Sequence, residues 1–287
     1  MSNSEGGFAP LPTALRAFGP LAPASPQESI APAKPALERR LFMPKSRWML
    51  AALVLFALAR SVGAEEADEI VQRADQVRRP GESFVWKVTV TSAEGGKAPT
   101  ADGFEVFVKG TRRSFVKFVA PARNVGRSLL ALDRDLWIYL PDAGRPVRIP
   151  LAQRLVGQVA NGDLARVDYA GDYDVTLIGA ESVEGVPCHV LDLKAKTKDV
   201  TYAAIKYWVA RDEPRPVKAE FYAGTGTLLK TGSFDPPKDL GGRRLVTRLT
   251  FVDAIRKDRT SMMEFGEVKV RDLPDKYFDK NYMKTLD

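Results

Sequence analysis

The side chains that most often perform chemistry are sparse in this sequence. His189 is the only histidine, and its neighbour Cys188 is the only cysteine. A histidine-rich zinc centre and an intramolecular disulfide are therefore both excluded. A serine hydrolase needs a strained Gly-x-Ser-x-Gly turn or an equivalent triad, and no such turn occurs. We expect His189 and Cys188 to be ordinary core or surface residues of a strand.

Paired carboxylates suit general acid–base catalysis, and the sequence contains three aspartate pairs. Each pair falls in a predicted turn or at a helix start, where aspartate forms local hydrogen bonds. A structural role is expected for all of them, namely Asp133 and Asp135, Asp172 and Asp174, and Asp272 and Asp275. The glycines of residues 239–244 lack the spacing and context of a phosphate-binding loop. No catalytic residue, metal or cofactor is predicted, which favours a binding protein over an enzyme.

One basic feature remains among the candidate sites. Lys194, Lys196 and Lys198 alternate along a predicted strand, so their side chains share one face. A solvated edge or rim is the expected role. A contact for acidic lipid head groups or for a protein partner is the alternative.

The first 64 residues are expected to lie outside the folded domain. Residues 43–47 form a short basic region, residues 48–59 are an unbroken apolar run, and small residues follow at 62–64. This pattern is typical of a secretory signal peptide cleaved after Ala64. The run is shorter than the roughly 20 residues of a membrane-spanning helix, so an uncleaved anchor is only the alternative.

Residues 1–42 contain seven prolines and no apolar period, which is the composition of a disordered extension. If translation begins at Met43, residues 1–42 are not part of the cellular protein and result only from the start codon that was assigned. Residues 39–43 also resemble a twin-arginine export signal, so export by the Sec or the twin-arginine route is expected to end in the periplasm. No cysteine stands at the predicted cleavage site, and a lipid-anchored protein is therefore not expected.

The charge of the exported part is nearly balanced. Seven of the 43 basic and three of the 36 acidic residues lie in residues 1–64, which leaves a net charge of +3 for residues 65–287. This balance gives no electrostatic footprint for nucleic acid. Stability without disulfides must come from a hydrophobic core.

The spacing of apolar residues predicts the elements of residues 65–287. A helix is expected over residues 65–79, because Ile70, Val71, Ala74 and Val77 recur at helical spacing. Short alternating strands separated by Gly, Pro and Asp turns follow, and the clearest is a three-stranded meander over residues 200–234. A terminal helix is expected over residues 272–286.

These elements predict a mainly β fold, a curved antiparallel sheet of about 11–13 strands that forms an open half-barrel with helices as a lid. The long connection over residues 151–171 interrupts the strands, and long connections are commonly lids or binding loops. A helix over residues 151–160 is the lid candidate, with an apolar face formed by Leu151, Leu155, Val156 and Val159.

The strand alternation also predicts which side chains face the inside of the curved sheet. A curled sheet under a lid encloses an apolar cavity that suits an acyl chain, although a fully packed core is the alternative. The predicted cavity residues are Phe84, Trp86, Val88, Phe104, Val106, Phe118, Ile205, Tyr207, Phe221, Leu229 and Phe251.

Several segments together resemble a known family. They include DLWIYLPDAGRPVRI at residues 135–149, the interrupting stretch at 153–174, VPCHVLDLKAK at 186–196, the meander at 202–231 and RDLPDKYFDKNYM at 271–283. In this order they resemble the outer-membrane lipoprotein-sorting protein family, whose members are LolA-like. The resemblance covers residues 65–287, and none of its motifs is a catalytic signature.

The resemblance implies a monomeric, non-enzymatic periplasmic carrier. Such a carrier binds the acyl chains of a lipid or lipoprotein in the cavity, receives this cargo from an inner-membrane transporter and passes it to an outer-membrane acceptor. Burial of each methylene stabilises such a complex by about 0.8 kcal/mol. A scaffold or interaction protein of the cell envelope and, less favoured, a lipid hydrolase are the alternatives.

Overall fold

The computed structural model of the protein describes residues 66–240 and 242–285. The predicted extension at residues 1–42 and the predicted signal peptide at 43–64 lie outside this part. Among the described residues, no helix has both the length and the apolar character needed to cross a membrane.

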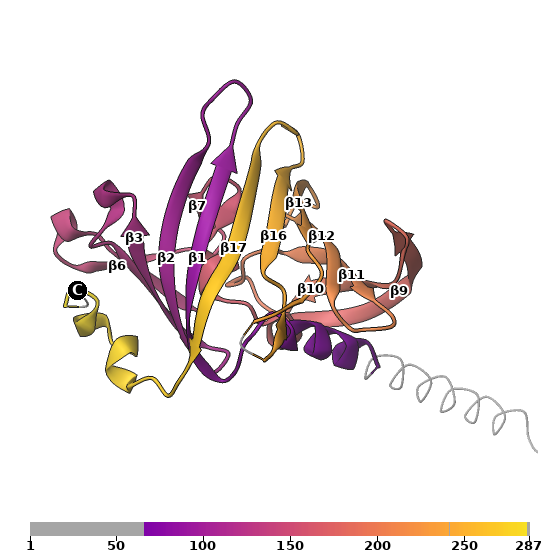
Figure 1. Cartoon of the computed structure of the whole chain (residues 1–287), viewed down its shortest axis with the longest axis horizontal. Helices are drawn as coiled ribbons and strands as arrows, with labels where there is room; N and C mark the ends of the chain where they lie inside the picture. The colour runs from indigo at the N-terminus through magenta and orange to yellow at the C-terminus, as the bar shows by residue number, and fades with distance from the viewer. Residues whose placement is uncertain (1–65, 241, 286–287) are drawn as a thin grey trace, which may run out of the picture. The chain divides into compact units, whose positions relative to one another are not determined.

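The dominant element is one antiparallel sheet of thirteen strands, with the order β6-β5-β4-β3-β2-β1-β17-β16-β13-β12-β11-β10-β9 (Figure 1). The first half consists of β1 (Ser83–Ala93), β2 (Thr100–Lys109), β3 (Arg113–Ala120), β4 (Ser128–Leu132), β5 (Asp135–Tyr139) and β6 (Pro146–Ile149). The second half consists of β9 (Tyr173–Val183), β10 (Val186–Ala195), β11 (Ala204–Ala210), β12 (Pro216–Tyr222), β13 (Leu228–Phe234), β16 (Arg248–Asp253) and β17 (Thr260–Val270). The sheet is open, with β6 and β9 at its two edges. The mainly β, open antiparallel fold and its strand number are as predicted.

The first and last long strands meet in the middle of the sheet. β1 pairs with β17 from Phe84 opposite Val270 to Ala93 opposite Thr260. Almost every other neighbour in the sheet is also a neighbour in sequence, as the predicted meander β11-β12-β13 illustrates. The sheet is therefore two local meanders joined along one line.

One face of the sheet carries the main hydrophobic core, and we call it the inner face. The helix at residues 66–76 packs there through its buried side chains Ala67, Val71 and Ala74. This agrees with the apolar stripe predicted for residues 65–79. The backbone N–H of Val246, just before β16, donates to the carbonyl of Val77 at 2.8 Å. This hydrogen bond joins the end of the helix region to the segment that precedes β16.

The long connection between β6 and β9 covers the rest of the inner face. We call residues 151–172 the cover segment; its β7 lies behind β1 and β17 in the view of Figure 1. It contains a small hairpin of β7 (Arg154–Val156) and β8 (Val159–Ala160), followed by the short helices α2 (Asn161–Ala165) and α3 (Tyr169–Asp172). The predicted helix over residues 151–160 is therefore wrong. Gly157, at φ +51°, turns the chain between Val156 and Val159, which pair with each other.

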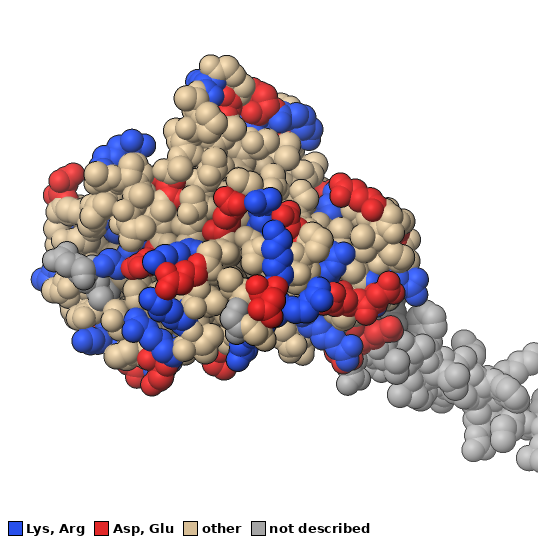
Figure 2. All heavy atoms as spheres, viewed as in Figure 1, with Lys and Arg blue, Asp and Glu red and all other residues tan. Residues whose placement is uncertain are grey.

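The outer face is covered only locally. The predicted terminal helix is replaced by two 3-10 turns, η3 (Asp275–Phe278) and η4 (Lys280–Tyr282), which pack on β1 to β5. Other short elements are η1 (Ala122–Asn124), η2 (Pro141–Ala143), β14 (Lys238–Asp239) and β15 (Arg244–Leu245). Figure 2 shows acidic and basic side chains interspersed over one side of the molecule, in keeping with the nearly balanced charge.

Candidate functional site

The structure brings ten of the eleven predicted cavity residues together in the core of the inner face. They are Phe84, Trp86, Val88, Phe104, Val106, Phe118, Ile205, Tyr207, Phe221 and Phe251, and each is at most 7% exposed. The alternation of side chains along each strand thus predicted which residues face inward on β1, β2, β3, β11, β12 and β16. Whether these side chains contact cargo stays a prediction.

Leu229 is the exception, because it is 43% exposed and its side chain leaves the opposite face of β13. The residue that faces inward is its neighbour Lys230, which pairs with Phe221 in the β12–β13 register. The register shifts by one residue between Phe221 and Tyr222, so the turn does not preserve the alternation assumed from the sequence. The placement of Leu229 in the cavity was wrong for this reason.

A pocket lies between helix α2 and the strands at the centre of the sheet. Its volume is about 70 Å³, and its apolar wall includes the predicted residues Phe84, Trp86, Val88 and Val106. The Trp86 ring lies 4.8 Å from the ring of Phe265, centroid to centroid. The pocket is much smaller than the about 300–1,000 Å³ of pockets that enclose small ligands, so the cover segment nearly fills the inner face.

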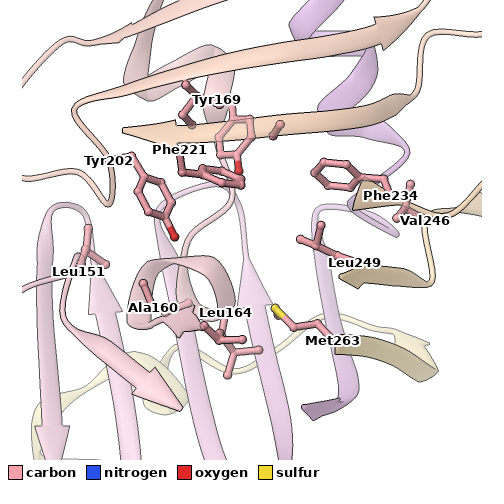
Figure 3. Packing of buried hydrophobic residues seen from close by; sticks show 14 of the residues in the cluster. Leu151, Ala160, Leu164, Tyr169, Tyr202, Phe221, Phe234, Val246, Leu249 and Met263 are labelled. Atoms are coloured by element: carbon pink, nitrogen blue, oxygen red, sulfur yellow. The ribbon is translucent and has the colours of Figure 1, made fainter. Parts of the chain in front are cut away.

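The cover segment fills this space with apolar side chains of its own. The predicted lid residues Leu151 and Val159 are buried, and Leu155 and Val156 are partly buried against the same core. Leu164 of α2, which the sequence did not single out, also inserts here. Figure 3 shows Leu151, Ala160 and Leu164 facing aromatic and aliphatic side chains of the sheet.

A buried polar cluster fastens α2 to the sheet. The Lys230 ammonium donates to an Asp163 carboxylate oxygen at 2.6 Å and to the Gln158 carbonyl at 2.6 Å. The Tyr202 hydroxyl donates to the same carboxylate at 2.8 Å; in Figure 3 it points toward α2. Burial lowers the pKa of Lys230, and the Asp163 carboxylate opposes this effect. The cluster therefore holds a charged pair inside an apolar core, where each member depends on the other.

The turn of the cover hairpin is docked with almost no clearance. A Cβ atom at Gly157 would lie 2.0 Å from the hydroxyl oxygen of Ser92 and 2.2 Å from that of Ser261. The Ser261 hydroxyl also accepts the backbone N–H of Gln158 at 2.8 Å. Only glycine fits at this position, because of both the contact and the positive φ.

A second polar link joins α3 to the end of the 66–76 helix. Asp75 accepts the backbone N–H of Ala170 at 3.1 Å and pairs with Arg78 at 3.5 Å. The Arg78 guanidinium lies 4.4 Å from the centroid of the Tyr169 ring. Burial raises the pKa of Asp75 to about 6, although Arg78 works in the opposite direction. Burial likewise raises the pKa of Tyr169 to about 12.

The other candidate residues show no catalytic arrangement. Cys188 is a buried free thiol on β10, and His189 beside it is partly exposed. Lys194 is exposed near Asp192, whereas the Lys196 ammonium donates to the carbonyl of Ala170 at 3.1 Å and thereby contacts α3. Among residues 66–240 and 242–285, no three potential ligands gather into a metal site.

Lys230 and Asp163 are the residues that sequence reasoning missed. A lysine in a strand is assigned to solvent by default, since lysine is almost never fully buried unless paired. The sequence does contain one indication that Lys230 faces inward. It alternates with Gly232 and Phe234 along β13, and both of these residues are buried. Its partner comes from a connection about 67 residues away, and local periodicity carries no information about such a contact.

Comparison with known proteins adds to this geometry. A family profile described as an uncharacterized protein matches residues 110–285. The crystal structure of a LolA superfamily protein from Nitrosomonas europaea is 38% identical and matches with a TM-score of 0.72, covering 75% of this chain and 98% of that one. No curated protein matches the sequence.

Two more distant structures share the fold. A DUF1329 family protein from Desulfovibrio piger has 23% identity and a TM-score of 0.68, over 77% of this chain and 99% of that one. An outer membrane lipoprotein-sorting protein domain from Vibrio parahaemolyticus has 20% identity and a TM-score of 0.66, over the same shares of the two chains.

Proposed function

Because the chain belongs to the LolA superfamily, we propose that it is a non-enzymatic periplasmic carrier for the acyl chains of a lipid or lipoprotein. The observation that carries this proposal is the apolar inner face under a separate cover segment. Export through a cleaved signal peptide, loading from an inner-membrane transporter and delivery to an outer-membrane acceptor complete the proposal. The carrier acts as a monomer and without a cofactor.

Cargo enters by exchange with the cover segment. The pocket of about 70 Å³ is too small for an acyl chain, but Leu151, Val159 and Leu164 occupy apolar surface that a chain could take over. When these apolar side chains withdraw from the inner face, the cargo replaces their contacts with contacts of the same kind. The apolar area hidden from water then changes little, and loading and release remain reversible.

The fastening of the cover segment suits such an exchange. The segment contains only short elements, and its polar contacts to the rest of the protein include the Lys230–Asp163 pair, the hydrogen bond from Gln158 to Ser261 and the Asp75–Ala170 hydrogen bond. A segment packed against a core in this way has two arrangements, closed or open, rather than a gradual deformation. Cargo shifts this equilibrium because it binds only the open state.

The test is native mass spectrometry of the protein purified from the periplasm, followed by organic extraction of anything bound. We expect a co-purifying lipid or acylated peptide in the wild type. Phe265→Asp, at a partly exposed position that lines the pocket, should lose it. Leu229→Asp makes the same kind of change on the opposite face of the sheet and should retain it. Circular dichroism verifies that both variants are folded.

Each alternative gives a distinct result. Formation of lipid hydrolysis products over time would show that the protein is a hydrolase and not a carrier. A protein that stays empty and takes up no fluorescent fatty acid would refute the carrier and favour an envelope scaffold. Retention of cargo by Phe265→Asp would refute the placement of the cargo beneath the cover segment.

A further inference from the structure

The pocket beneath the cover segment is lined by basic as well as apolar side chains. Four arginines line it: Arg78 and Arg79 after the 66–76 helix, Arg113 at the start of β3, and Arg166 directly after α2. The only acidic side chain among the lining residues is Asp163, which is already paired with Lys230. An uncharged acyl chain needs no guanidinium groups beside it.

Arg166 has an unused donor inside this site. Its side chain is 4% exposed, and its Nε and Nη2 atoms bind both oxygens of Asp172 at 2.7 and 2.5 Å. Its Nη1 atom is buried and has no hydrogen-bond partner in the part of the chain that the structure describes. Buried donors are normally satisfied, so this N–H group lacks its usual acceptor, and it belongs to a residue that lines the pocket.

Arg79 and Arg113 leave further positive charge at the pocket. Arg79 donates to the carbonyl of Gly110 at 2.8 Å, and within residues 66–240 and 242–285 no carboxylate pairs with it. Arg113 pairs with Asp275 at 3.0 Å, but the Asp275 side chain is 74% exposed, so solvent screens this pair. Planar guanidinium groups match carboxylate and phosphate oxygens in two-point hydrogen bonds.

We infer that the arginine wall binds the oxyanion head group, a carboxylate or a phosphate, of an acidic amphiphile whose acyl chain runs along the inner face. The inference rests on the proposed carrier function and narrows its cargo to acidic lipids. Arg166 Nη1 and the Arg79 guanidinium are the contacts to the oxyanion. The Asp172 carboxylate positions Arg166, and the apolar wall around Trp86 receives the first methylenes.

The test is calorimetric titration of the protein purified from the periplasm with amphiphiles that share one acyl chain. The probes are laurate, lysophosphatidylglycerol with a lauroyl chain, and monolaurin, the uncharged glycerol ester. We expect at least one acidic probe to bind about tenfold more tightly than monolaurin, as for a charge-assisted hydrogen bond. The ranking of laurate and lysophosphatidylglycerol then identifies the oxyanion as a carboxylate or a phosphate.

Variants locate the contact. Arg79→Gln and Arg166→Lys should each weaken binding of the acidic probe about tenfold and leave the affinity for monolaurin unchanged. Arg112→Gln, next to Arg113 but with a side chain that is 59% exposed and outside the pocket lining, is the matched control and should change neither.

The possible outcomes distinguish failure of the head-group site from failure of the proposed carrier function. Equal binding of acidic and neutral probes, or an Arg79→Gln variant that loses both equally, would overturn the head-group site while the carrier function stands. A wild type that binds none of the three probes would overturn the carrier function, and the head-group site with it.

Discussion

Replacing Lys230 by methionine should unfasten the cover segment. The Lys230 and Asp163 side chains are 5% and 4% exposed, and removing one partner of such a buried pair costs about 3–5 kcal/mol. The Tyr202 hydroxyl and the Ala160 N–H still donate to the stranded Asp163 carboxylate, which places the expected loss near 3 kcal/mol. Each 1.4 kcal/mol is a factor of ten, so opening of the cover segment should become about a hundredfold more frequent.

Hydrogen exchange measures this opening directly. Peptides from residues 151–172 should exchange about a hundredfold faster in Lys230→Met, whereas peptides from β1 and β17 should change less. The matched control is Lys269→Met, because Lys269 pairs with Glu267 at 2.9 Å on the surface and is 63% exposed. An exposed pair of this kind contributes at most about 1 kcal/mol.

A double-mutant cycle decides whether the pair itself is responsible. Once Lys230→Met is in place, Asp163→Asn should cost little or restore stability, because the unpaired buried charge is gone. Additive losses in the double variant, or a cover segment whose exchange in Lys230→Met stays within threefold of the wild type, would refute the fastening role of the pair.

Three further results are expected. Burial raises the pKa of Asp75 from 3.8 to about 6. The protonated side chain therefore stabilises the fold fully below pH 3.8, and this stabilisation is lost as the pH rises through 6. In urea titrations, the difference in unfolding free energy between wild type and Asp75→Asn should shift by about 3 kcal/mol across this window. Gly157→Ala should displace the cover hairpin, since the new Cβ would meet the Ser92 hydroxyl, and should lower the urea midpoint more than Gly144→Ala, which has a similar φ but open space. Cys188 is fully buried, and burial raises the pKa of its thiol, so a thiol reagent should label it only as fast as the protein unfolds.

The sequence was sufficient for the fold because an antiparallel sheet is built from local alternation. In β1, Phe84, Trp86, Val88 and Val90 all face the inner side, as a strict period of two requires. The short turns of the meander then determine which strands are neighbours. Neither step needs information from distant parts of the chain.

The cover segment shows where this reasoning stops. Leu151, Leu155 and Val159 have helical spacing, yet Gly157 makes a hairpin that the spacing does not reveal. Its polar fastening joins Asp163 to Lys230, two residues on elements that do not pair with each other. Such tertiary contacts override local preference, and the burial of Lys230 is stable only because the partner is present.

The pairing of β1 with β17 has a consequence for how the chain reaches its native state. The strands on either side of this line form local hairpins and need little chain closure, but the line itself joins residues 84–93 to residues 260–270. Non-local pairings of this kind slow folding, because chain-closure entropy is lost before the contact forms. Until this pairing forms, β1 has an open edge, and that edge is the expected site of misassembly between chains.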